Sequence, residues 1–167
     1  LDAPLLAETL YHHCRPALVA GCFSTAMVTA SAYYGVPVAR VGTALVMERL
    51  TPYPNSNRVP LAVIDHLVPD LERAEAPALV GAAPDTLPPL VRAIGFCMQP
   101  GTYPGLREPT ANWLRRHLAD CPAPYFPASR LAELGLPGSR PRARARVRVD
   151  RSLRRVRRAV RRASRKR

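Results

Sequence analysis

The sequence predicts an α/β protein in which a parallel sheet is flanked by helices. Residues 17–23 (ALVAGCF) are short and uniformly apolar, which is typical of a strand buried on both faces of a parallel sheet. Residues 24–35 open with Ser24, a favoured helix N-cap, and close with Gly35, a natural helix stop. Residues 37–41 (PVARV) are predicted as a second strand. Strand, helix and strand in this order form the crossover unit of a parallel sheet.

The remaining elements are predicted from the helical spacing of apolar residues and from prolines that interrupt it. A helix before the first strand should end at Arg15, because the residue before a proline avoids the helical region. Residues 51–60 form a turn-rich loop bracketed by prolines. The further predicted helices cover residues 4–14, 59–68, 90–98, 109–120 and a short segment at 129–135.

The basic charge of the chain is confined to its C-terminal part. Of the net charge of +13, residues 140–167 contribute +14, with 15 Arg or Lys and one acid. Residues 1–139 hold 10 bases and 11 acids and are almost neutral. We therefore divide the chain into an α/β domain, residues 1–138, and an Arg-rich basic tail, residues 139–167, which is expected to be disordered or helical.

Composition and cysteine spacing exclude several classes of protein. No run of about 18 apolar residues predicts a transmembrane helix, and the first residues lack the pattern of a signal peptide. The four cysteines match no zinc signature, and we expect no metal site. Free thiols in a reducing cytoplasm are the favoured interpretation, with a disulfide or a catalytic cysteine as alternatives. The chain begins with Leu1, as expected of a fragment, a processed product or an unusual start codon.

The turn between the first predicted strand and its helix is the main candidate binding site. It presents Ser24 and Thr25 at a helix N-terminus, where outward N–H groups and the helix dipole favour an anion. The carboxyl edge of a parallel sheet is also where phosphate ligands bind. The alternative is that Ser24 only caps the helix.

An ordered string of residues around this turn resembles a known family. GCFSTAMVTASAYYG, followed by PVARVG and TPYPNSNRVP, resembles the polysialyltransferase-like family of bacterial glycosyltransferases over roughly residues 1–70. The resemblance implies part of the C-terminal Rossmann-like domain of a GT-B enzyme. In sialyltransferases of this broad group, a serine motif in a strand-to-helix turn contacts the phosphate of CMP-sialic acid. Gly21, Ser24 and Thr25 are therefore the implied donor-binding residues, and the implied donor is a CMP-sugar.

The sequence departs from this family at the catalytic motifs. The family carries a D/E-D/E-G motif, whose carboxylate is the general base, and an HP motif upstream of the serine motif. Asp2 and Glu8 lie in no such triplet, and His12 is followed by His13 rather than by proline. The resemblance thus implies a truncated enzyme that contributes the donor site, with unknown catalytic residues, a glycan acceptor and a missing N-terminal domain.

Other polar and aromatic residues have a functional and a plain structural interpretation. Asn55 and Asn57 could line a sugar site or simply form a turn, and these alternatives are evenly matched. Asp65 and His66 suggest acid–base chemistry but fit a solvated helix face better. Adjacent His12 and His13 point about 100° apart on a helix, so solvent positions are favoured over metal binding, and Trp113 is expected in the core rather than in a sugar site.

The basic tail has three interpretations. A basic amphipathic helix over residues 140–167 could lie on an anionic membrane surface, could bind nucleic acid through phosphates, or could have no selected partner. The tail has no aromatic residue to stack on bases, which disfavours nucleic acid. We expect a glycosyltransferase fragment located in the cytoplasm, peripheral at the inner face of the membrane. The alternative is a non-catalytic basic protein that binds membrane or nucleic acid through this tail.

Overall fold

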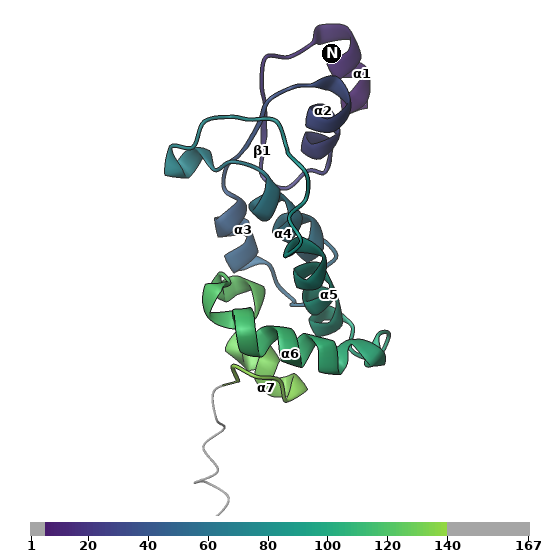
Figure 1. Ribbon diagram of the computed structural model, residues 1–167. Coiled ribbons are helices and arrows are strands. Elements are labelled where there is room, and N and C mark those ends of the chain that lie inside the picture. The colour runs from purple at the N-terminus through teal and green to yellow at the C-terminus, as the bar shows by residue number, and fades with distance from the viewer. Residues whose placement is uncertain (1–5, 140–167) are drawn as a thin grey trace, which may run out of the picture.

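The computed structural model describes residues 6–139, so the predictions made for residues 1–5 and for the basic tail at 140–167 lie outside the described part of the chain (Figure 1). Helices dominate this part, and a small sheet accompanies them. The α-helices are α1 (Ala7–Cys14), α2 (Ala26–Tyr34), α3 (Thr43–Arg49), α4 (Arg58–Leu67), α5 (Leu87–Met98), α6 (Arg107–His117) and α7 (Ala128–Leu134). The strands are β1 (Val19–Gly21) and β2 (Val38–Arg40), and the 3₁₀ helices are η1 (Leu71–Arg73), η2 (Pro104–Leu106), η3 (Leu118–Asp120) and η4 (Ala123–Tyr125).

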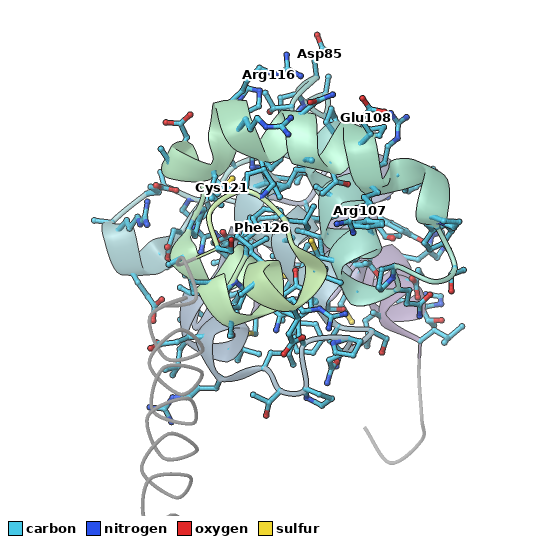
Figure 2. The ribbon with its side chains drawn as sticks, turned by 90° about the horizontal axis from the view of Figure 1, so that it is seen from below. Asp85, Arg107, Glu108, Arg116, Cys121 and Phe126 are labelled. Atoms are coloured by element: carbon cyan, nitrogen blue, oxygen red, sulfur yellow. The ribbon has the colours of Figure 1, made fainter. Side chains whose placement is uncertain are left out.

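The elements are arranged along one long direction of the molecule. Helices α1 and α2 and strand β1 lie at one end, α6 and α7 lie at the other, and α3, α4 and α5 lie between them (Figure 1). On α6, the charged side chains of Arg116 and Glu108 point outward, whereas Phe126 lies beneath the helix (Figure 2). The helices at the C-terminal end therefore cover a core that is separate from the sheet.

Strands β1 and β2 are parallel, and α2 makes the crossover between them. Their register pairs Val19 with Val38 and Gly21 with Arg40. This confirms the predicted crossover unit and a mixed α/β protein. Within residues 6–139, however, the regular sheet has only these two strands, and isolated bridges to Asp70 and Ala78 extend it beyond β2.

The first strand differs from its prediction in burial. β1 is half-buried, with Ala20 exposed, and the preceding Leu18 is exposed as well. The expectation of a strand at 17–23 buried on both faces is therefore wrong. Strand β2 is buried throughout instead. Apolar composition did not separate the two cases because Ala and Leu are common on protein surfaces as well as in cores.

The predicted helices are present, with shifted ends, and one further helix was not predicted. Helix α5 begins at Leu87 rather than at residue 90, because Pro88 and Pro89 occupy its first turn, where no backbone N–H is needed. Helix α3 follows Gly42, which adopts a left-handed φ of 70°. Sequence analysis assigned no element to its residues, although Ala, Leu, Met and Glu are good helix formers.

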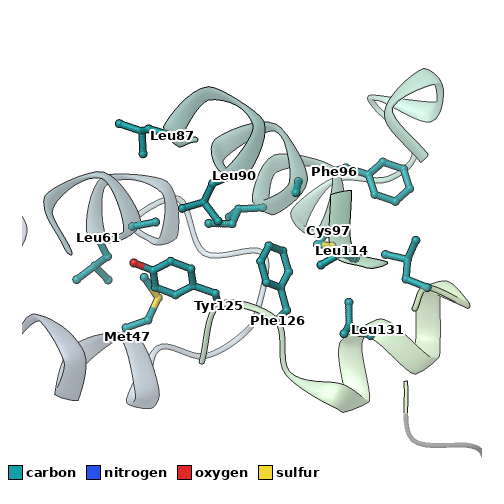
Figure 3. Packing of buried hydrophobic residues seen from close by; sticks show 14 residues of the cluster. Met47, Leu61, Leu87, Leu90, Phe96, Cys97, Leu114, Tyr125, Phe126 and Leu131 are labelled. Carbon is teal, nitrogen blue, oxygen red and sulfur yellow. The ribbon is translucent and has the colours of Figure 1, made fainter. Parts of the chain in front are cut away.

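Helix α4 lies between two apolar clusters and contributes residues to both. Leu61 belongs to the larger cluster, which draws its residues from α3 to α7 (Figure 3). Ile64 belongs to the smaller one, formed with residues of α1, α2 and β2. Both side chains are fully buried. The two clusters therefore meet at α4, where Leu61 and Ile64 lie one turn apart.

A buried ion-pair network joins the sheet to α4. Arg40, the last residue of β2, places Nη1 2.9 Å from an Asp65 carboxylate oxygen and 3.1 Å from one of Asp70. Neither approach has hydrogen-bond geometry, so the attraction is ionic, while Nε donates to the Val68 carbonyl at 3.0 Å. The hydroxyl of Tyr125 donates to the other oxygen of Asp65. One guanidinium thus fixes β2, α4, the segment after α4 and η4 relative to one another.

We expect Arg40→Met to destabilise the protein by about 3–5 kcal/mol, because it leaves the carboxylates of Asp65 and Asp70 without their buried cation. The measurement is the free energy of unfolding from urea titrations. Arg73→Met is the matched control, since Arg73 pairs with the same Asp70 but is 74% exposed. It should cost less than about 1 kcal/mol. Equal losses in the two variants would show that burial does not strengthen the Arg40 pairs.

Candidate functional site

The turn between β1 and α2 places Ser24 and Thr25 on the surface, as predicted. Both residues are exposed and follow the carboxyl end of β1. The helix begins at Ala26, so Thr25 rather than Ser24 is the N-cap, and its hydroxyl makes no capping bond. Ser24 Oγ instead accepts the N–H of Ala26 at 3.3 Å. Ser24 therefore makes a capping contact, as expected if its role is to cap the helix. Its own O–H is still able to donate a hydrogen bond.

The backbone donors of this turn are partly used within the protein. The N–H of Met27 bonds to the carbonyl of Ser24 at 3.1 Å, and that of Ala26 is taken by the Ser24 side chain. The turn itself is held by the buried Thr43, whose hydroxyl donates to the carbonyl of Cys22. An anion at this turn would therefore rely on the two hydroxyls and on the dipole of the nine-residue α2.

Gly21 has a packing reason to be glycine. A Cβ on this residue would lie 3.1 Å from Sδ of Met27, a buried side chain of α2. Its carbonyl is also occupied, because it accepts the N–H of Val41 at 3.0 Å. The predicted role of Gly21 in donor binding stays a prediction, and the contact that the structure gives it is the close approach of α2 to β1.

Asn55 and Asn57 form the turn that starts α4. Oδ1 of Asn55 accepts the N–H of Asn57 at 3.0 Å, and the carbonyl of Asn57 accepts the N–H of Leu61 at the same distance. This turn follows the C-terminal end of α3, whereas the Ser24 turn is tied to its first residue, Thr43. Seven helical residues span about 10 Å. The two predicted sites thus lie at opposite ends of α3, and no hydrogen bond between described residues joins them.

A cleft of about 410 Å³ lies between the start of α5, the end of α6 and η4. Its aromatic wall is Trp113, which is half-buried and packs against Phe126 and His117, with ring centroids 5.8 and 5.2 Å apart. Trp113 therefore joins the edge of the core, as predicted, and also faces the cleft.

The pair Asp65 and His66 lies in the same cleft, but the two residues have different surroundings. The Asp65 carboxylate is held by Arg40 and by the hydroxyl of Tyr125, so both of its oxygens are engaged. His66 is exposed, and its Nε2 lies 3.3 Å from Oγ1 of Thr86. Asp65 is therefore a structural residue in an ion-pair network, and the prediction of a solvated helix face is wrong for it.

A second cleft, of about 440 Å³, lies beside Tyr53. Two guanidinium groups face the Tyr53 ring: Cζ of Arg58 lies 4.2 Å and that of Arg130 lies 5.6 Å from its centroid. The Tyr53 hydroxyl donates to the carbonyl of Tyr125 at 2.8 Å, and Nε of Arg130 donates to the carbonyl of Cys97, also at 2.8 Å. Sequence analysis missed this cluster, whose only signal was the tyrosine and arginine within TPYPNSNRVP.

Arg58 is buried although no carboxylate pairs with it in the described part of the chain. Its guanidinium donates to the carbonyls of Tyr53, Leu50 and Pro124 at 2.8–2.9 Å. Burial lowers the pKa of Arg58, and Tyr53 opposes this effect. The hydrogen bonds of Arg58 thus join the loop after α3 to the segment before α7.

The comparisons with known proteins identify no relative. No family model matches this chain, and no curated protein and no solved structure matches it either. Between residues 6 and 139, no helix combines the length and the apolar character that a membrane crossing requires. The resemblance to polysialyltransferases therefore stays a prediction.

We expect the free energy of unfolding to fall as the pH rises from 9 to 11. Burial raises the pKa of the Cys97 thiol to about 11, with the nearby Arg130 and Tyr53 opposing the rise. The unfolded chain therefore loses this proton first, and stability that is complete below pH 9 declines by about 1.4 kcal/mol per pH unit. Burial raises the pKa of Tyr53 as well, which adds to the loss at higher pH.

Urea titrations under reducing conditions at several pH values measure this slope. Cys97→Ala should make the decline between pH 9 and 10 shallower, whereas Cys14→Ala, at an exposed cysteine, should leave it as in the wild type. The same slope in all three proteins would contradict the assignment to Cys97.

Proposed function

We propose that this chain contributes the donor-phosphate site of a glycosyltransferase similar to the bacterial polysialyltransferases, and that the donor is a CMP-activated sugar. The observation that supports this proposal is the exposed pair Ser24 and Thr25, placed between the carboxyl end of β1 and the start of α2 in a parallel crossover unit. Ligand phosphates commonly bind at this position in α/β proteins.

The chemistry of the turn suits a phosphate monoester. Ser24 Oγ already accepts one N–H, and its own O–H can still donate to a further acceptor, such as a phosphate oxygen. Thr25 has no capping bond and offers a second hydroxyl. The N-terminal end of α2 adds a favourable electrostatic potential, and no acidic residue lies in its first turn to cancel it.

The proposed role of this chain is donor binding and not the whole transfer reaction. The family's general base lies in a motif that this sequence lacks, and the carboxylate of Asp65 is engaged by Arg40 and Tyr125. In the GT-B arrangement of that family, the N-terminal domain supplies the base. The partial Rossmann-like domain proposed here corresponds to α1, β1, α2 and β2.

Calorimetric titration of the full chain with CMP tests the donor site. We expect CMP to bind, and we expect Ser24→Ala and Thr25→Ala each to weaken binding about tenfold, as the loss of one hydrogen bond to a charged group predicts. Thr102→Ala removes an exposed hydroxyl far along the chain and should leave the affinity unchanged.

Cytidine, which lacks the phosphate, separates the phosphate contact from base or ribose contacts. It should bind the wild type and the Ser24→Ala variant equally well. A protein that does not bind CMP, or variants at Ser24 and Thr25 that bind it like the wild type, would remove the basis of the proposal.

The charge of the tail supports a second candidate function, which is binding to an anionic membrane surface. Residues 140–167 carry a net charge of +14, and each basic residue near such a surface contributes about 1 kcal/mol. In the proposed enzyme, this contact would hold the catalytic region at the inner face of the membrane.

Sedimentation with vesicles tests this second function. The full chain should sediment with vesicles that contain phosphatidylglycerol, should remain in solution with pure phosphatidylcholine, and should be released as the salt concentration rises. Deletion of residues 140–167 should abolish sedimentation. Unchanged sedimentation after deletion, or a duplex DNA that displaces the protein from the vesicles at equal phosphate concentration, would overturn the membrane assignment.

A further inference from the structure

The cleft beside Trp113 combines an aromatic wall with hydrogen-bonding groups from distant segments. Trp113 and His117 belong to α6, Asp120 belongs to η3, and Thr86 precedes α5. The volume of about 410 Å³ falls in the range of small-molecule sites. None of these groups is needed at the Ser24 turn, so this cleft is independent of the proposed donor site.

The charges of the cleft do not favour an anion. Two cations, Arg40 and Arg73, and two carboxylates, Asp65 and Asp120, line it, and their charges cancel. Arg40 is also paired with Asp70, which is buried behind it. The local balance of these side chains is therefore slightly negative, so a phosphate or a carboxylate ligand would meet no free excess of positive charge.

The polar groups at the rim suit a ligand that both donates and accepts hydrogen bonds. His66 Nε2 lies 3.3 Å from Oγ1 of Thr86 and is engaged by it. A hydroxyl has one donor and two acceptor positions, so Thr86 keeps capacity for a ligand hydroxyl. Asp120 is exposed and has no salt bridge or hydrogen bond from its side chain within the described residues, so its carboxylate is available as an acceptor. Hydroxyl-rich molecules match this set better than flat bases, whose hydrogen-bonding groups lie in one plane.

The aromatic wall supplies the apolar part of such a site. Trp113 is half-buried, and its ring packs near those of Phe126 and His117. Leu90 and Pro122 extend the apolar lining. The C–H face of a sugar ring packs on a wall of this kind while its hydroxyls reach polar groups at the perimeter, an arrangement that places each part of the ligand against a matching surface.

We propose that this cleft binds a neutral sugar residue against Trp113 and His117, with Asp120 and Thr86 hydrogen-bonded to its hydroxyls. The ligand class follows from three features together: the aromatic wall, the rim of groups that donate and accept, and the absence of excess positive charge among the described lining residues. In a glycosyltransferase, the bound sugar would belong to the acceptor glycan. The proposed sugar site does not depend on donor binding at Ser24.

Tryptophan fluorescence reports binding directly, because Trp113 is the only tryptophan of the chain. The full chain is titrated with the methyl glycosides of galactose, N-acetylglucosamine and N-acetylgalactosamine. At least one of them should change the emission in a saturable way, with a dissociation constant in the millimolar range. N-acetylneuraminic acid, which is anionic, and cytidine, which is planar at its base, should give no saturable change in the Trp113 emission at millimolar or lower concentrations.

Two variants and a matched control locate the site. Asp120→Asn and Thr86→Ala should each weaken sugar binding about fivefold, as expected for the loss of one hydrogen bond. Asp85→Asn makes the same chemical change beside Thr86, at a side chain that points away from the protein (Figure 2), and should leave the affinity unchanged.

The outcomes separate this proposal from the donor site. Ser24→Ala should retain the sugar response, and Asp120→Asn should retain the affinity for CMP, so either proposal can fail without the other. The neutral-sugar assignment is overturned if no neutral glycoside changes the Trp113 emission, if N-acetylneuraminic acid or cytidine changes this emission at lower concentrations than the glycosides do, or if Asp120→Asn and Thr86→Ala bind sugar like the wild type.

Discussion

The ion pairs of Arg40 with Asp65 and Asp70 are the constraint on which the arrangement of the other elements depends. Burying a guanidinium costs several kcal/mol unless nearby anions and hydrogen-bond acceptors compensate. Because Arg40 ends a fully buried strand, both carboxylates must come to it, from α4 and from the segment that follows. Asp65 in turn accepts the hydroxyl of Tyr125, which brings the C-terminal part of the chain to the same point.

This network also relates the two proposed sites. Gly21 and Arg40 are partners in the register of the sheet, so the turn that carries Ser24 and the cleft that begins at Arg40 both start from the carboxyl ends of parallel strands. That edge of an α/β sheet is where ligands generally bind.

The predictions from sequence succeeded where a local rule governs the structure. Prolines, the glycine stop at Gly35 and helical spacing located most helices, and the crossover around Ser24 is present. The rules failed where burial depends on distant segments. Apolar composition could not reveal that β1 is half-exposed while β2 is buried. It also could not reveal that Asp65 of α4 would be engaged by Arg40 and Tyr125.

The sequence by itself determined the crossover unit, the hydroxyl pair at the start of α2 and the concentration of charge in residues 140–167. Each of these depends on residues close together in the chain. Only the tertiary structure decided the clefts beside Trp113 and Tyr53. Their walls combine residues from helices and loops that are tens of positions apart, and only packing around α4 sets those distances. Hydrogen bonds and ion pairs of this range leave no periodic signal in a sequence.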